Sequence, residues 1–238
     1  MFYSACLHQS MKSAKVYPIV LAAGPSPRLD LTKPPEQLGG KSAFEVALEN
    51  CAGLHEPIVV LGCRAPLLRR YVPRGARIVV NQKWRSGQLS SLLAGLRRVP
   101  RGAAFMLYPL DQIFLTKPLV HRIVRAFTER KKHHQIVMPR YKGQAGHPVI
   151  FSAAIRKELY HAQTAREVVY REPRRILYFA ARTPAIWKEF DSPASYRRFQ
   201  REVRSRKNWK RLLEPPLPRG ARAREAPGHP AQSRDHQA

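Results

Sequence analysis

The sequence predicts an α/β fold in which a mostly parallel sheet carries helices on both faces, a three-layer Rossmann-like arrangement. Two observations support this prediction. Short apolar runs typical of strands alternate with amphipathic segments of helical length, which is the pattern of βαβ units. The strand-like runs also contain few polar residues, as expected for strands that are buried on both faces.

The first half of the chain follows this alternation closely. Strands are expected at residues 16–23, 57–61, 77–80 and 104–110. Helices are expected where apolar residues recur at intervals of three and four, around residues 44–51, 89–96 and 119–132. The last of these is predicted to end in Arg130, Lys131 and Lys132, because cations suit the C-terminus of a helix.

The second half is less regular. Strands are expected at residues 136–138, 148–151 and 176–180, and a short helix at 164–170. A basic helix is predicted from Pro193, with Ser192 as its N-cap. The tail has too few large apolar residues to offset its ordering entropy, so disorder is predicted there. The predicted organisation is an N-terminal extension over 1–15, one domain over 16–213 and a disordered basic tail over 214–238.

Composition bounds the function classes. The 238 residues are 44% hydrophobic and 25% charged, which excludes a wholly disordered chain. The net charge of +27 will attract phosphates, nucleic acid or an anionic membrane surface. Three cysteines without a CxxC spacing argue against a disulfide framework or structural zinc and favour a reducing compartment, the cytoplasm. No run of about 18 apolar residues occurs, so no membrane span is expected.

The loop after the first expected strand is the first candidate site, since open parallel sheets bind ligands at the carboxyl ends of their strands. The small residues at 22–24 let backbone N–H groups approach a ligand, and Arg28 and Lys33 suit phosphate oxygens. A basic surface loop without a ligand is an equally weighted alternative. Gly40-Lys41-Ser42 does not complete a P-loop, because Pro35 occupies the position of its first glycine.

The segment from Leu21 to Lys33 resembles the LAAGxSxRMGxxK signature of the MobA-like nucleotidyltransferases. A Gly-Gly pair at 39–40 and Glu45 follow as in that family. The resemblance implies a GT-A-type, Rossmann-like sheet and catalytic roles for Arg28 and Lys33. It implies nucleotide contacts from Leu21, Ala22, Ala23, Gly24 and Ser26. Asp30 departs from the signature, which has glycine there, and its carboxylate would repel a triphosphate.

Two further segments resemble the same family. Residues 81–96 resemble its N-x-x-[WY]-x-x-G-x-x-x-S segment, which implies that Gly87 lets the base approach and that Ser91 hydrogen-bonds to it. An ordinary amphipathic helix is the alternative for this segment. Residues 108–112 resemble its metal loop, which implies that Asp111 holds Mg²⁺. Ile113 replaces the proline that usually follows.

Two segments of the second half carry the resemblance further. Residues 143–151 resemble the GHP element of the cytidylyltransferase branch that acts on molybdopterin, which implies acceptor contacts from Gly146 and His147. His147 is a candidate to hydrogen-bond or to carry a proton near neutral pH. Residues 189–193 resemble the family's D-[IV]-D-[ST]-P, with Glu189 replacing its first aspartate. Asp191 is then a second metal contact or simply a carboxylate at a helix N-terminus.

The resemblance implies a magnesium-dependent transfer of a nucleoside monophosphate, with CTP favoured as donor and molybdopterin as the phosphorylated acceptor. The competing hypothesis is a basic nucleic-acid- or anion-binding protein that retains a degenerate form of the fold. Its support is the departures at Asp30, Ile113 and Glu189, together with the basic C-terminal helix. Residues 197–225 carry eleven Lys or Arg against three Glu. A packed helix with a basic outer face is the favoured interpretation of that segment.

Overall fold

The computed structural model describes residues 16–25 and 41–187, and its centre is one sheet of eight strands. The strand order is β3-β2-β1-β4-β7-β5-β6, with β8 paired to β5. The strands are β1 (Val16–Ala22), β2 (Ile58–Leu61), β3 (Arg77–Val80), β4 (Ala104–Pro109), β5 (Ile136–Tyr141), β6 (Gln144–Ala145), β7 (Val149–Phe151) and β8 (Ile176–Ala180).

The sheet is mostly parallel, as predicted. β1 runs parallel to both β2 and β4, β2 to β3, and β5 to β8. β7 is antiparallel to β4 and β5, and the two-residue β6 is antiparallel to β5. β1, β2, β4 and β7 are almost wholly buried, which explains their apolar sequences.

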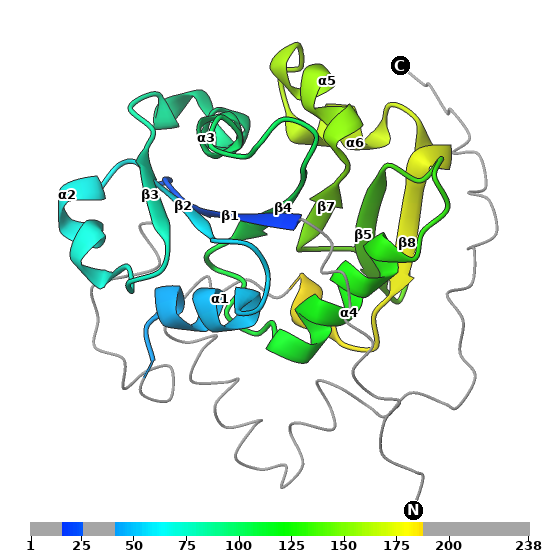
Figure 1. Ribbon diagram of the computed structural model, residues 1–238, viewed down its shortest axis with the longest axis horizontal. Helices are drawn as coiled ribbons and strands as arrows, with labels where there is room; N and C mark the ends of the chain where they lie inside the picture. The colour runs from blue at the N-terminus through cyan, green and yellow to red at the C-terminus, as the bar shows by residue number, and fades with distance from the viewer. Residues whose placement is uncertain (1–15, 26–40, 188–238) are drawn as a thin grey trace, which may run out of the picture.

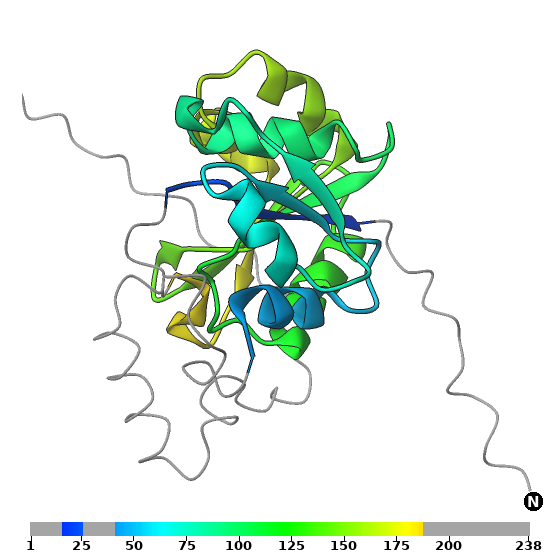
Figure 2. The same ribbon diagram turned by 90° about the vertical axis from the view of Figure 1, so that its left-hand side faces the viewer.

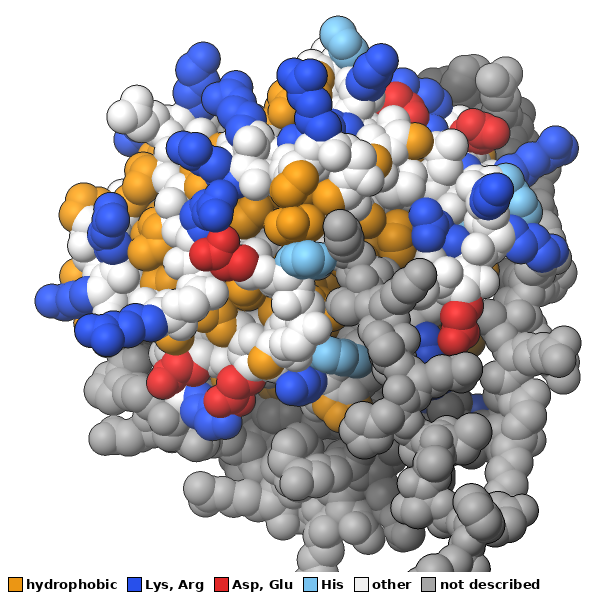
Figure 3. Space-filling model, in the orientation of Figure 1, with side chains coloured by type: hydrophobic (Ala, Val, Ile, Leu, Met, Phe, Trp, Pro, Cys, Tyr) orange, Lys and Arg blue, Asp and Glu red, His pale blue; other side chains and the backbone are white. Residues whose placement is uncertain are grey.

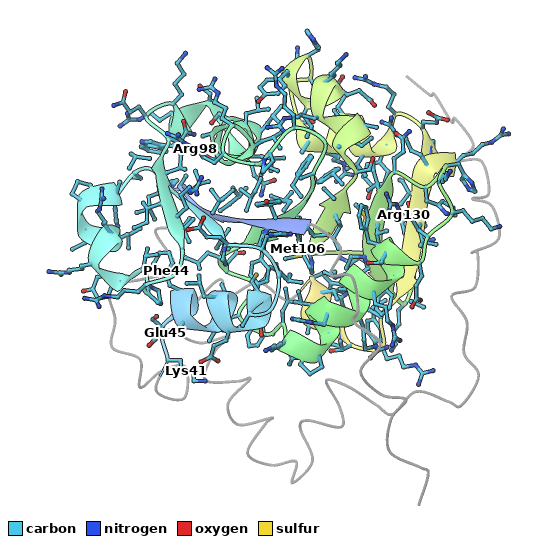
Figure 4. All side chains as sticks on the ribbon, in the orientation of Figure 1. Lys41, Phe44, Glu45, Arg98, Met106 and Arg130 are labelled. Carbon is cyan, nitrogen blue, oxygen red and sulfur yellow. The ribbon has the colours of Figure 1, made fainter. Side chains whose placement is uncertain are left out.

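Helices cover both faces of the sheet (Figures 1 and 2). One face carries α1 (Ala43–Cys51), α2 (Ala65–Leu68) and α4 (Lys117–Thr128), and the other carries α3 (Gln88–Leu96), α5 (Arg156–Tyr160) and α6 (Ala165–Tyr170). Two apolar clusters result, one on each face; Figure 4 labels Phe44 and Met106, which belong to the first. The predicted three-layer architecture is confirmed. None of the helices described is both long and apolar enough to cross a membrane.

Helix ends account for the main differences from the predicted elements. α4 ends at Thr128, so the prediction that this helix continues to Lys132 is wrong. The Arg130 guanidinium instead donates to the carbonyls of Phe127 and His134, just beyond the helix. The short helices α2 and α5 were not predicted. The expected basic helix from Pro193, the extension 1–15 and the tail 214–238 lie outside the described residues.

The Gly-Lys-Ser sequence before α1 has a structural explanation. Ser42 is the N-cap of α1 and forms a capping box with Glu45. The Glu45 carboxylate accepts from the Ser42 N–H at 2.6 Å, and the Ser42 hydroxyl accepts from the Glu45 N–H at 3.2 Å. These bonds lower the pKa of Glu45. Figure 4 labels Lys41 and Glu45 at this end of α1. Glu45 therefore stabilises the start of the helix.

α3 packs closely on the sheet because residue 95 is glycine. A Cβ at Gly95 would collide with the side chains of Ile19 on β1 and Val60 on β2. Both side chains are β-branched and fully buried, so neither can move aside easily. Gly95 thus sets the distance between α3 and the two strands.

We expect Gly95→Val to lower the free energy of unfolding by about 1–3 kcal/mol, the usual cost of overpacking a core. Ala94→Val is the matched control, since it adds the same side chain one residue earlier at a partly exposed position. Chemical denaturation of both variants measures the difference. Equal stabilities would contradict the close packing at Gly95.

Candidate active site

A cleft of about 550 Å³ opens at the carboxyl ends of β1 and β4. Strand order reverses here, because β2 and β3 lie on one side of β1 and β4 lies on the other. Such a reversal is the usual ligand site of an open α/β sheet. Three separate segments line the cleft: residues 21–25, residues 84–91 and residues 109–111.

The first wall is the chain that leaves β1, and it contains four predicted nucleotide-binding residues: Leu21, Ala22, Ala23 and Gly24. Gly24 is exposed, and a Cβ there would meet nothing within 4 Å. The Ala23 carbonyl accepts from the Cys63 N–H at 3.0 Å, and a Cβ at Gly62 would collide with Ala23. The end of β2 therefore holds this wall in place. The predicted residues Ser26, Arg28 and Lys33 lie outside the described residues.

The second wall is the start of α3, and Asn81 organises it. The Asn81 amide donates to the hydroxyls of Ser90 at 2.9 Å and Ser91 at 3.0 Å, and its carbonyl oxygen accepts from the Lys83 N–H at 3.0 Å. Gly87 begins the helix with φ of 91°, a conformation that favours glycine. No side chain in the described part of the chain caps this N-terminus. The predicted residues Gly87 and Ser91 both line the cleft.

The third wall is the loop after β4, which carries Asp111. The Leu110 N–H donates to the Leu21 carbonyl at 3.0 Å and so joins this wall to the first. Beneath it, the Asn50 amide of α1 donates to the Leu115 carbonyl at 2.8 Å and to the Tyr108 hydroxyl at 3.0 Å. The half-buried Asp111 is thus presented to the cleft by a loop that is anchored in the core.

The phenol of Tyr108 completes this anchor. It donates to the Gln112 carbonyl at 3.3 Å, and burial raises its pKa, so it stays neutral. Sequence reasoning missed both Tyr108 and Asn50. The polar Asn50 next to Cys51, on the apolar face of an expected helix, was the available signal.

Six further residues that line the cleft were not predicted as site residues: Pro25, Trp84, Arg85, Gln88, Pro109 and Leu110. The Arg85 guanidinium lies over the Trp84 ring, 4.5 Å from its centroid. Among the described lining residues, Arg85 is the only cation. Trp84 fits the aromatic position of the resemblance to residues 81–96, whereas nothing in the sequence singled out Arg85.

The donor set at this cleft fits a hard divalent cation that is shared with phosphate. Asp111 supplies one carboxylate, and the described residues contain no group of three or more His, Cys, Asp or Glu able to hold a metal alone. Mg²⁺ is typically bound by one or two carboxylates plus substrate phosphates. The second predicted ligand, Asp191, lies outside the described residues.

A second pocket of about 280 Å³ shares Gln88 with the cleft and contains the predicted acceptor residues Gly146 and His147. Its other lining residues, most of them apolar, are Leu107, Met138, Ala145, Val149, Phe151, Ala165, Arg166, Val169 and Tyr170. A Cβ at Gly146 would collide with the Ile186 carbonyl, so glycine is needed at this position for packing.

His147 lines the same pocket. Its backbone N–H donates to the Ile186 carbonyl at 2.6 Å, and its ring Nδ1 is buried without a hydrogen-bond partner among the described residues. Burial lowers the pKa of His147 to about 4. The imidazole is therefore neutral at pH 7. The expectation that His147 carries a proton near neutral pH is corrected accordingly.

The chain belongs to the MobA-like NTP transferase family, whose domain matches residues 18–182. A similar solved structure is Rv0371c from Mycobacterium tuberculosis H37Rv, with 26% identity and a TM-score of 0.65. That match covers 79% of this chain and 99% of the other. No curated protein matches the chain.

Two more distant structures show the same fold. One is 2-C-methyl-D-erythritol 4-phosphate cytidylyltransferase from Thermus thermophilus, with 15% identity and a TM-score of 0.59 over 80% of this chain and 99% of that chain. The other is molybdopterin-guanine dinucleotide biosynthesis protein A from Archaeoglobus fulgidus, with 16% identity and a TM-score of 0.58 over 80% of this chain and 100% of that chain. The predicted family and fold class are confirmed.

The low pKa of His147 predicts a pH dependence of stability. An unfolded histidine binds its proton near pH 6.5, whereas the folded His147 binds one only near pH 4. The contribution of the neutral His147 to the free energy of unfolding is therefore fully present above pH 6.5 and is lost as the pH falls towards 4. We expect His147→Asn, which cannot take up a proton, to lose less stability than the parent over this window. Parallel curves of unfolding free energy against pH for the two proteins would contradict the assignment.

Proposed function

We propose that the protein transfers CMP from CTP to a phosphorylated small-molecule acceptor, with molybdopterin as the favoured acceptor, and releases pyrophosphate. The observation that carries this proposal is the cleft itself. Three segments that resemble separate nucleotidyltransferase motifs, far apart in the sequence, line this one space. An unrelated basic surface would give no reason for these segments to meet.

The cleft offers different chemistry at its different walls. The base would lie against Gly87 and Ser91, where the uncapped start of α3 offers backbone N–H donors. The open backbone at Gly24 would let the nucleotide approach the end of β1 closely. Arg85, together with the proposed catalytic residues Arg28 and Lys33, would neutralise the triphosphate.

The reaction needs positioning more than covalent help from the protein. An oxygen of the acceptor phosphate forms a bond to the α-phosphorus, and the bond from that phosphorus to the α–β bridging oxygen breaks. The electron pair leaves with pyrophosphate. A phosphate nucleophile is largely deprotonated at pH 7, so no general base is required.

Asp111, with Asp191 as the proposed second ligand, would hold a divalent cation at this cleft. When bound, such a cation supplies positive charge against the phosphate oxygens of the triphosphate. Mg²⁺ is the proposed ion. A structure of Rv0371c in complex with manganese, 24% identical to this chain, is consistent with a divalent-cation requirement.

The second pocket would receive the acceptor, since Gln88 joins it to the nucleotide cleft. His147 would act there as a neutral hydrogen-bonding group, and Gly146 would act by holding the pocket wall against Ile186. The GHP element at 146–148 favours the cytidylyl transfer and the molybdopterin acceptor. A named cytidylyltransferase and a named molybdopterin protein among the structures of this fold are compatible with both proposals.

Pyrophosphate release with Mg²⁺ and each of the four nucleoside triphosphates, with and without molybdopterin, tests the substrates. We expect release with CTP only, and only when molybdopterin is present. Release that does not depend on molybdopterin would reject it as the acceptor, while release with a different triphosphate would reject CTP. No release in any combination would reject the transferase itself in favour of a binding protein.

Lys33→Ala is expected to lower the rate of pyrophosphate release about a hundredfold or more, because the protein loses a point charge that stabilises the triphosphate in the transition state. The fold should persist, which circular dichroism checks. Lys41→Ala is the matched control, since Lys41 is an exposed cation that pairs with Glu49 at 2.7 Å, away from the cleft. Unchanged turnover in the Lys33 variant would contradict the assignment of Lys33 as a catalytic residue.

A further inference from the structure

A groove of about 660 Å³, the β3 groove, runs between the edge strand β3 and α3. Its apolar floor is formed by Val79, Val80, Leu93 and Ala94. Val80 is unusually exposed for a strand valine, at 47% of its surface. The remaining lining residues are polar or basic: Asn81, Gln82, Lys83, Ser90, Arg97 and Arg98. The groove is separate from both pockets of the proposed active site.

One side of β3 has backbone groups that pair with no other described strand. Within the described residues β3 pairs only with β2, and the Arg77 and Asn81 N–H groups donate to that side, to Pro57 and Leu61 at 2.8 Å each. Along a strand, alternate residues direct their backbone N–H and carbonyl groups to opposite edges of the strand. The backbone N–H and carbonyl groups of Ile78 and Val80 therefore face away from the sheet, where another strand would pair.

The rim of the groove is positive. Lys83, Arg97 and Arg98 are exposed, and none of them forms an ion pair with another described residue. Among the described residues, no Asp or Glu lines the groove. Figure 4 labels Arg98 near the end of α3, above β3, and Figure 3 shows Lys and Arg side chains around apolar patches on this side of the molecule.

The net charge of each candidate ligand helps to identify what the β3 groove binds. A second copy of this chain, at +27, would be repelled. Segments 1–15 and 188–238 are also basic on balance, and segment 26–40 has no net charge. A nucleic acid would match the charge, but the groove has no aromatic side chain on which a base could stack. The apolar floor and the free strand edge instead match an extended peptide.

We propose that the β3 groove binds an acidic, extended segment of a partner protein, which adds as a strand to β3. Its backbone pairs with Ile78 and Val80, its central apolar side chains on the α3 side pack on Val79 and Leu93, and carboxylates at its two ends face Lys83, Arg97 and Arg98. Such strand addition obtains affinity from main-chain hydrogen bonds and specificity from the alternating side chains.

The probe is a fluorescein-labelled peptide of about ten residues with valines at its centre and glutamates at both ends, and its binding is followed by fluorescence anisotropy at about 0.15 M salt. We expect Val80→Pro to weaken binding about tenfold or more, because proline removes the outward N–H without touching the bonds to β2. Val80→Thr keeps that N–H and a similar shape, so we expect it to bind within about twofold of the parent.

The charged rim is tested separately, which also decides the question if Val80→Pro fails to fold. The double variant Arg97→Glu/Arg98→Glu should weaken peptide binding about tenfold or more. The control Lys132→Glu/Lys157→Glu makes the same charge change at exposed sites elsewhere and should leave peptide binding unchanged. Equal loss in both pairs would show non-specific attraction and overturn the proposal. The proposal would also be overturned if a labelled oligouridylate bound more tightly than the peptide and lost its binding in the Arg97→Glu/Arg98→Glu variant.

Discussion

The parallel pairing of β1 with β4 determines where everything else in this protein lies. Six residue pairs, from Val16 with Ala104 to Leu21 with Pro109, join the two strands, and the Leu110 N–H to the Leu21 carbonyl extends the ladder by one bond. Because β1 is also paired with β2 on its other side, its end is fixed from both directions. The loops that leave β1 and β4 must then face each other across one cleft, and the start of α3 closes it.

The walls of this cleft are held by buried amide side chains behind it. Asn81 ties the turn after β3 to the first residues of α3, and Asn50 ties α1 to the loop that carries Asp111. Both are buried polar residues whose amide N–H groups are paired with oxygen acceptors. Preorganised walls of this kind suit a reaction that depends on positioning and electrostatics, since the protein need not reorganise when the nucleotide binds.

Periodicity alone predicted the fold well. The apolar runs at β1, β2, β4 and β7 and the leucines of α3 are dictated by burial, which is the strongest signal that a sequence carries. The short α2 and α5 have too few turns to show a periodic pattern, and Arg130, beyond the end of α4, donates to the Phe127 carbonyl from outside the helix. The loop motifs of the family predicted most of the residues that line the cleft. Arg85 and Asn50 could not be found that way, because their positions depend on tertiary contacts.

The central claim is that the cleft between β1, β4 and the start of α3 is a nucleotide site. The most direct measurement is a crystal structure of the protein with CTP and Mn²⁺. We expect the cytosine to lie at Gly87 and Ser91, the triphosphate beside Arg85 and the metal ion on Asp111. A nucleotide bound elsewhere, or a cleft that stays free of nucleotide at saturating CTP, would contradict it.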